Sequence, residues 1–286
     1  MSLWHVVILA IVQGLTELLP VSSSAHVVVA EKLLGLNPSS PPMTLLLVML
    51  HTGTMFAVIV YFWSQWRDTY FESTAAFKKF AGLVVLATVL TGLVGEAIIK
   101  IIEKTAFRGV PHGEIENLFS HLELIAPALA AAGILILIAG ISDKRSPAGK
   151  ANNLNAKQAG IIGTVQGLCL PFRGFSRSGA TISAGMLAGV AKARAEAFSF
   201  ALAVVLTPPV VAREALRLVR AEHITGTANL ASAAFPSLLG AVFAFFAGLL
   251  ALRWLSRWLE HGRWHLFGIY CLAAAAVVGY LRHLGY

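Results

Sequence analysis

The sequence predicts an all-α polytopic membrane protein in which six transmembrane helices and two re-entrant helical hairpins form an inverted-topology repeat. Three observations predict this fold. Of the 286 residues, 57% are hydrophobic and only 13% are charged, whereas about 25% of the residues of a soluble domain are charged. Six stretches are long and apolar enough to cross a bilayer. One short motif occurs twice, once in each half of the chain.

The six predicted spans are apolar stretches of about 20 residues, the length that a helix needs to cross the hydrocarbon core. They cover residues 43–63, 80–102, 122–141, 197–219, 234–252 and 265–281. The apolar stretch at residues 3–19 has no basic segment ahead of it and carries Gln13 and Glu17, so we do not interpret it as a signal peptide. The formal net charge of +8 comes mostly from short links between the spans, which argues against a nucleic-acid partner.

An internal repeat explains the remaining apolar pieces. The motif Val-Gln-Gly-Leu begins at Val12 and again at Val165, and each copy is followed by a proline and a run rich in serine, glycine and alanine. Each copy belongs to a pair of apolar pieces that are too short to cross the bilayer comfortably. The pairs are residues 3–19 with 23–36 and residues 156–170 with 178–190. Two short helices joined by a polar break are typical of a re-entrant hairpin.

The parity of the spans sets the relation between the repeats. A hairpin enters and leaves on one face, so each repeat makes three net crossings and the second lies upside down relative to the first. The two polar breaks should then face each other. We expect a single membrane domain over residues 1–286, with repeat 1 at 1–141 and repeat 2 at 157–286.

The distribution of lysine and arginine predicts the orientation. The links at 64–79, 142–196 and 253–264 hold twelve of these residues, against eight on the opposite face. The excess of positive charge places these links in the cytoplasm and both termini outside. Under this topology, the first hairpin opens from the outer face.

The polar break of the first repeat is a candidate anion site. Gln13 and Glu17 lie one turn apart on the same helix face, and Pro20 ends that helix. Three serines, Ser22–Ser24, are candidates for the N-cap of the next helix, where hydroxyls and free N–H groups attract an anion. The alternative is that the serines only cap a helix and that Glu17 is a satisfied interfacial carboxylate. An ionisable residue inside an apolar helix is usually functional, and His26 flanks the same break, which favours a site.

The polar break of the second repeat adds positive charge. Arg177 stays charged at any relevant pH and can hold two phosphate oxygens at once. Gly174 lets the backbone approach a ligand closely. Hydroxyl groups at the start of the following helix come from Ser176, Ser178 and Thr181. The alternative is that Arg177 pairs only with Glu17 of the first repeat, which would still bring the two breaks together.

These two motifs resemble those of the integral-membrane undecaprenyl-diphosphate phosphatases associated with bacitracin resistance. The first signature is read here in Gln13, Glu17, the stretch 20–23 and His26, and the second in residues 173–181. The resemblance implies removal of the terminal phosphate of undecaprenyl diphosphate at the outer, periplasmic face of the bacterial cytoplasmic (inner) membrane. The reaction recycles the carrier lipid for peptidoglycan synthesis.

The resemblance also implies roles for particular residues. It assigns catalysis to Glu17, Ser23, His26 and Arg177, and it implies a divalent cation, Mg²⁺ or Ca²⁺, bound with the diphosphate and held by Glu17. The residues expected to bind substrate are Gln13, Ser22, Ser24, Gly174, Ser176, Ser178 and Thr181. Two positions depart from the signatures. Gln13 stands where many members carry Glu, and Arg173 stands where the signature has proline, which loosens a turn and adds charge near the site.

Three questions stay open at this stage. A flippase or transporter of lipid phosphate or a small anion is the alternative function, because inverted repeats with broken helices are a transporter trait. His51, inside the first span, either lines the cavity or is hydrogen-bonded to a neighbouring helix. The expected partners are the polyprenyl diphosphate and membrane lipids, and a homodimer is one assembly that the sequence allows.

Overall fold

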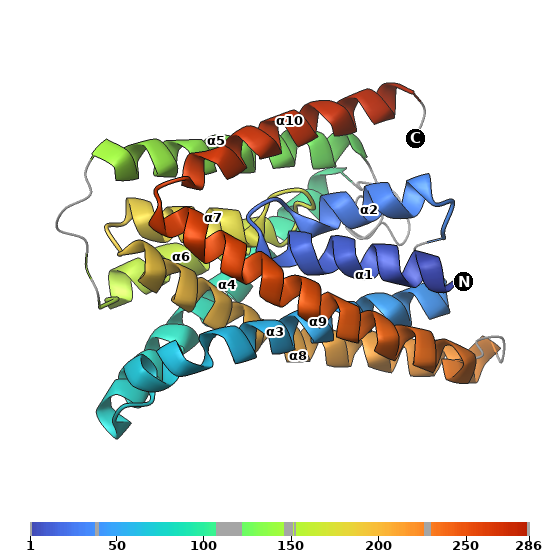
Figure 1. Cartoon of the computed structure of the whole chain (residues 1–286), viewed down its shortest axis with the longest axis horizontal. Coiled ribbons are helices and arrows are strands. Elements are labelled where there is room, and N and C mark those ends of the chain that lie inside the picture. Colours follow the sequence, from blue (N-terminus) through green and yellow to red (C-terminus); the bar gives the residue numbers. More distant parts are fainter. Residues whose placement is uncertain are drawn as a thin grey trace.

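The computed structural model describes residues 2–37, 40–106, 122–145, 151, 153–225 and 230–284, and these residues form helices joined by short links (Figure 1). Within these ranges, the β-type pairing is one isolated bridge between Ala151 and Val190. The predicted all-α class is therefore confirmed.

Six helices are long and apolar enough to cross a membrane, as the sequence predicted. Each contains one of the predicted spans. They are α3 (Pro41–Tyr70), α4 (Thr74–Ala106), α5 (Leu122–Arg145), α8 (Lys192–Thr225), α9 (Leu230–Glu260) and α10 (Trp264–His283). Large apolar side chains on these helices point away from the protein, for example Val85 at 61% and Leu250 at 63% exposure. Such exposed apolar surface suits contact with lipid.

Four shorter helices correspond to the pieces beside the repeated motif. They are α1 (Leu3–Leu18), α2 (Ser23–Leu33), α6 (Ala156–Cys169) and α7 (Arg177–Leu187). Pro20 disfavours helical backbone at the residue before it, and Leu19 accordingly has an extended conformation that ends α1. Helix α6 begins with a reciprocal capping box between Asn155 and Gln158.

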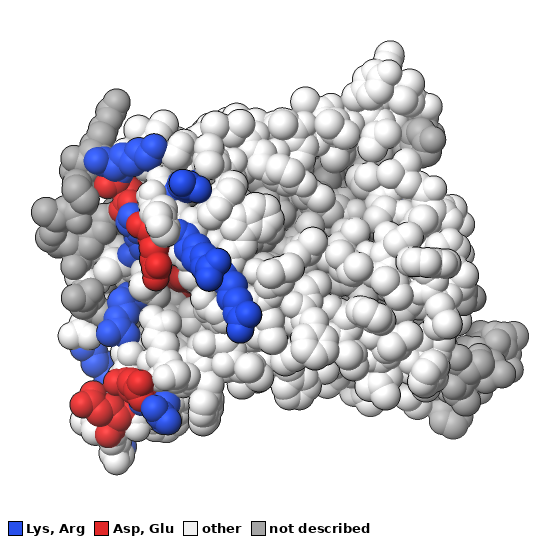
Figure 2. Space-filling model, in the orientation of Figure 1, with Lys and Arg blue, Asp and Glu red and all other residues white. Residues whose placement is uncertain are grey.

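The two pairs of short helices occupy opposite halves of the molecule (Figure 1). Helices α1 and α2 lie toward the end that carries both termini, whereas α6 and α7 lie toward the end with the α3–α4 and α9–α10 turns. The charged side chains visible in Figure 2 gather near this second end and leave most of the same face uncharged. The polar breaks therefore lie deep within the bundle, between its two ends.

Two glycines show that the repeat extends to helix packing. A Cβ atom on Gly14 of α1 would lie 2.7 Å from the carbonyl oxygen of Ala244 in α9, and one on Gly167 of α6 would lie 2.8 Å from that of Thr91 in α4. Gly167 follows Gly14, and Ala244 follows Thr91, by the same 153 residues that separate the two motifs. Equivalent helices thus cross at equivalent glycines, where only a missing side chain permits such a close approach.

Candidate functional site

The polar breaks of the two repeats meet, as the parity of the spans predicted. Three hydrogen bonds join them. Ser178 Oγ donates to the carbonyl oxygen of Leu19 at 3.2 Å, and the Gly174 N–H donates to Ser24 Oγ at 3.3 Å. An Arg177 N–H group donates to Glu17 Oε1, also at 3.2 Å. The pairing of Glu17 with Arg177 that the alternative interpretation expected is therefore present, and it lies within a larger polar junction.

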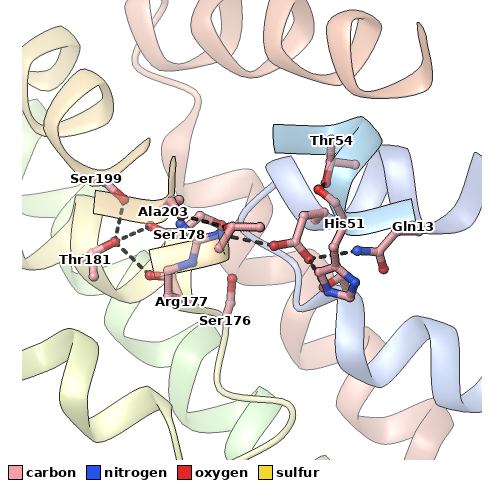
Figure 3. Close-up of polar contacts among 12 residues, drawn as sticks. Gln13, His51, Thr54, Ser176, Arg177, Ser178, Thr181, Ser199 and Ala203 are labelled. Carbon is pink, nitrogen blue, oxygen red and sulfur yellow. Dashed lines mark hydrogen bonds and ion pairs between the residues drawn. The ribbon is translucent and has the colours of Figure 1, made fainter. Parts of the chain in front are cut away.

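Glu17 is the centre of this junction. Its Oε2 atom accepts hydrogen bonds from Ser23 Oγ at 2.5 Å and from Gln13 Nε2 at 3.1 Å. Arg177 binds the other carboxylate oxygen, and His51 Nε2 lies 3.8 Å from Oε2. In Figure 3, Arg177 lies on one side of these contacts, and Gln13 and His51 lie on the other. The hydroxyl proton of Ser23 therefore lies within hydrogen-bonding distance of the Glu17 carboxylate.

The backbone at Ser22 aims Ser23 at Glu17. Ser22 has a φ of 67°, the one positive φ at a non-glycine residue in the described ranges, and such a conformation costs on the order of 1–3 kcal/mol. Ser22 occupies the N-cap position of α2, yet its side chain makes no cap hydrogen bond. A serine thus holds the predicted N-cap position, but it does not cap with its hydroxyl, since its backbone is not in the extended conformation that N-cap residues normally adopt. The hydroxyls of Ser23 and Ser24 instead contact Glu17 and Gly174.

The junction borders a cavity of about 270 Å³. Its wall combines a carboxylate, two guanidinium groups and several hydroxyls, which come from the two breaks and from the helix ends beside them. These polar groups belong to Thr16, Glu17, Ser22, Ser23, Ser24, Arg173, Ser176, Arg177 and Ser178. The remaining wall is apolar and includes Leu170 and Phe172. Hydroxyl and guanidinium donors around a small opening suit a multiply charged anion.

Other residues of the second motif hold its shape. Ser176 Oγ accepts a hydrogen bond from the Gly179 N–H and caps α7. Thr181 is fully buried, donates to the Arg177 carbonyl oxygen at 2.8 Å and lies 2.6 Å from Ser199 Oγ. Its hydroxyl is thus engaged behind Arg177 rather than at the cavity wall. Thr181 and Ser199 fix the first turn of α7, from which Arg177 extends.

The structure separates His26 from the Glu17 junction. Its ring contacts the Ser22 carbonyl oxygen through Nδ1 at 2.8 Å and the Tyr270 hydroxyl through Nε2 at 2.7 Å. It lines an apolar groove of about 300 Å³ between α2, α5 and α10, together with Leu129 and Tyr270. The histidine beside Glu17 is His51, whose place inside an apolar span was the signal for it. No sequence signal pointed to Tyr270.

The donor set limits how a metal could bind here. Among the described residues, no three His, Cys, Asp or Glu side chains gather as a metal site would require. Glu17 supplies the carboxylate of the cavity wall. Gln13 stands at the position where many family members carry a second carboxylate, and here it donates a hydrogen bond to Glu17. A divalent cation at this place would take most of its ligands from phosphate and water, as Mg²⁺ commonly does.

Known proteins resemble the chain over nearly its whole length. The model of the family described as bacitracin resistance protein BacA matches residues 6–277. An undecaprenyl-diphosphatase 2 of Acinetobacter baylyi is 59% identical over 281 residues, which cover 97% of each chain. Proteins with the same name from Burkholderia orbicola and Burkholderia thailandensis are 36% and 35% identical, over 96% of this chain and 95% of theirs.

Proposed function

The chain belongs to the family described as bacitracin resistance protein BacA, and on this premise we propose that it acts as an undecaprenyl-diphosphatase. It hydrolyses undecaprenyl diphosphate to undecaprenyl phosphate and inorganic phosphate. The observation that carries the mechanism is the 2.5 Å hydrogen bond from Ser23 Oγ to Glu17 Oε2, at the wall of a cavity that also presents two arginines. A hydroxyl paired with a carboxylate is the arrangement of an activated nucleophile.

In the first step, Ser23 Oγ attacks the terminal phosphorus and Glu17 takes the hydroxyl proton. The bond from that phosphorus to the bridging oxygen breaks, and undecaprenyl phosphate leaves with the proton that Glu17 returns to it. In the second step, a water molecule attacks the phosphoserine, and Glu17 carries a water proton to the Ser23 oxygen. Inorganic phosphate is released and the serine is restored.

Arg177 stabilises the phosphoryl group during both steps. Its Nη2 atom donates to Glu17, whereas Nη1 has no hydrogen-bond partner among the described residues. That N–H group is a donor for a phosphate oxygen, and a preorganised donor of this kind stabilises charge in the transition state without reorganisation. Gln13 and His51 keep the carboxylate in place from the opposite side.

We propose that a divalent cation, Mg²⁺ or Ca²⁺, binds together with the diphosphate, with Glu17 as its protein carboxylate. A single carboxylate fits an ion that arrives with the substrate better than a resident one. When bound, the cation neutralises phosphate charge. It also offsets the electrostatic repulsion between the Glu17 carboxylate and the diphosphate.

We also propose that the six spans and the hairpins α1–α2 and α6–α7 form an inverted repeat in one membrane domain, with repeat 1 at 1–141 and repeat 2 at 157–286. The equivalent glycine crossings and the opposite positions of the hairpins support this arrangement. The basic links are cytoplasmic, and the cavity opens to the periplasmic face.

The native thiols, Cys169 and Cys271, are buried, so new cysteines at Ser2 and His261 can be labelled separately. Labelling of S2C from the periplasm and of H261C only after permeabilisation is the expected result.

The function is tested by phosphate release from undecaprenyl diphosphate with purified protein, with and without a chelator. Release that stops in chelator and returns with Mg²⁺ or Ca²⁺ supports both the hydrolase and the cation. Unchanged release in chelator overturns the cation alone. Absence of release, together with movement of lipid phosphate across vesicles, would instead support the flippase or transporter alternative.

A further inference from the structure

Arg173 lies in a tight turn whose shape is suited to a proline. The Phe175 N–H donates to the Phe172 carbonyl oxygen at 3.1 Å, and Gly174 has a φ of 101°. A positive φ at the third residue is the type II pattern, in which proline is favoured at the second residue. Arg173 holds that second position, so the chain has a charged side chain where the turn would accept a rigid ring.

The turn is fixed against its surroundings. The Gly174 N–H donates to Ser24 Oγ, and a Cβ atom on Gly174 would lie 2.5 Å from the carbonyl oxygen of Ile125. The backbone beside Arg173 is therefore wedged between the start of α2 and helix α5. From this anchored position, the exposed Arg173 side chain lines the same cavity as Ser23 and Arg177.

A buried carboxylate lies within electrostatic reach of Arg173. Glu31 of α2 is 1% exposed, and its Oε1 atom has no hydrogen-bond partner among the described residues. Burial raises the pKa of Glu31 to about 7, and the positive charge of Arg173 opposes this rise. Glu31 thus attracts the guanidinium toward α2 at the edge of the cavity.

We propose that Arg173 is a second phosphate-binding cation of this site, which holds the phosphate that stays on the lipid while Arg177 and Ser23 meet the phosphate that is transferred. The inference rests on the proposed function and deepens it. A diphosphate has two anionic groups in fixed proximity, and the cavity presents two arginines from one motif. The lipid product keeps this phosphate, so Arg173 should bind undecaprenyl phosphate as well as the substrate.

The test is Arg173→Pro in the full-length protein, because proline suits the turn and removes the charge. The KM for undecaprenyl diphosphate should rise roughly tenfold or more, the loss expected for a charge-assisted hydrogen bond. The kcat should change much less, and thermal stability should hold. Affinity for undecaprenyl phosphate should fall by a similar factor, because this product keeps the phosphate that Arg173 binds. Arg282→Ala is the matched control, because Arg282 pairs with Glu123 at the end of α10 and does not line the cavity.

A charge exchange separates ligand binding from a purely structural pair. If Arg173 only holds α2 through Glu31, the double variant E31R/R173E restores the wild-type KM, and the proposal is wrong. If Arg173 binds phosphate, the exchange leaves the KM raised, and Arg173→Lys recovers part of the lost affinity.

Binding of a non-hydrolysable prenyl methylenediphosphonate gives the same comparison without turnover. An inactive wild type would therefore overturn the proposed function and still leave Arg173 tested, whereas equal analogue affinity in wild type and R173P would overturn this proposal. R173A replaces R173P in every arm if the proline variant does not fold.

Discussion

The first hairpin, α1–α2, and the second, α6–α7, have the same architecture and opposite chemistry. Gln13 donates to the Glu17 carboxylate, whereas its equivalent Gln166 is fully buried and donates to Thr91 Oγ1 at 3.2 Å. The position of Glu17 is taken by Leu170 in the second copy, and that of Ser24 by Arg177. Both copies of the repeat therefore have the same scaffold, and the polar junction arises where they differ. The first copy brings Glu17 and the proposed nucleophile Ser23, and the second brings Arg177.

The largest expected effect is at Glu17. Glu17→Gln keeps the side-chain shape but removes the base, so kcat should fall about a thousandfold, within the range of general-base catalysis. The exchange variant E17L/L170E moves the carboxylate to the equivalent position of the second repeat. Leu170 borders the same cavity but lies on the other hairpin from Ser23, so phosphate release should stay as low as in E17Q. Recovered activity in the exchange variant would show that the copies are interchangeable.

Ser23 and its repeat equivalent Ser176 should respond differently. Ser23→Ala should lower kcat about as much as Glu17→Gln, and the double variant E17Q/S23A should be little worse than either, because groups that act as a unit are not additive. Ser176→Ala removes the cap of α7 and should cost about 1 kcal/mol of stability, with a smaller loss of kcat. Steady-state phosphate release and thermal unfolding in detergent measure both. Wild-type kcat in S23A would favour direct attack by water.

The glycine crossings should show the opposite result, namely equal effects in the two repeats. Gly14→Ala and Gly167→Ala each place a methyl group under 3 Å from a facing carbonyl oxygen. Each should destabilise the protein by about 1–3 kcal/mol, the usual cost of overpacking. Gly82→Ala, where a Cβ atom meets nothing within 4 Å, is the control. A strong asymmetry between G14A and G167A in thermal unfolding would argue against equivalent packing.

The smallest expected effect concerns pH and Glu31. Burial raises the pKa of Glu31 from 4.5 to about 7, so the folded state holds a proton that the unfolded chain has released. The resulting stabilisation is complete below pH 4.5 and is lost as the pH rises through 7. Glu31→Gln stays neutral, so its Tm should fall less between pH 5 and pH 8 than that of the wild type, by roughly a few degrees. Glu123→Gln, at an exposed carboxylate, should follow the wild-type curve. Parallel curves for E31Q and the wild type would show that Glu31 does not titrate in this way.

Much of this arrangement could be predicted from the sequence, because membrane spans and repeats leave strong signals. Apolar length predicted the six long helices, and the parity of crossings predicted that the two breaks meet. The direction in which individual side chains point could not be predicted. Hydropathy does not fix the rotation of a short helix such as α2, so it could not show that His26 turns to Tyr270, 244 residues away. The inward place of Thr181 depends on Ser199 of a separate helix, which the motif alone does not reveal.

The pairing of Glu17 with Arg177 also has a consequence for biogenesis. The two residues are 160 positions apart, so the ribosome completes α1 to α6 before the arginine exists. During that interval, the first half of the chain enters the membrane with a carboxylate that lacks its cationic partner. Pairing with Arg177, once it is synthesised, favours assembly of the two halves. A truncated first half should therefore fold poorly by itself and be degraded by membrane quality control.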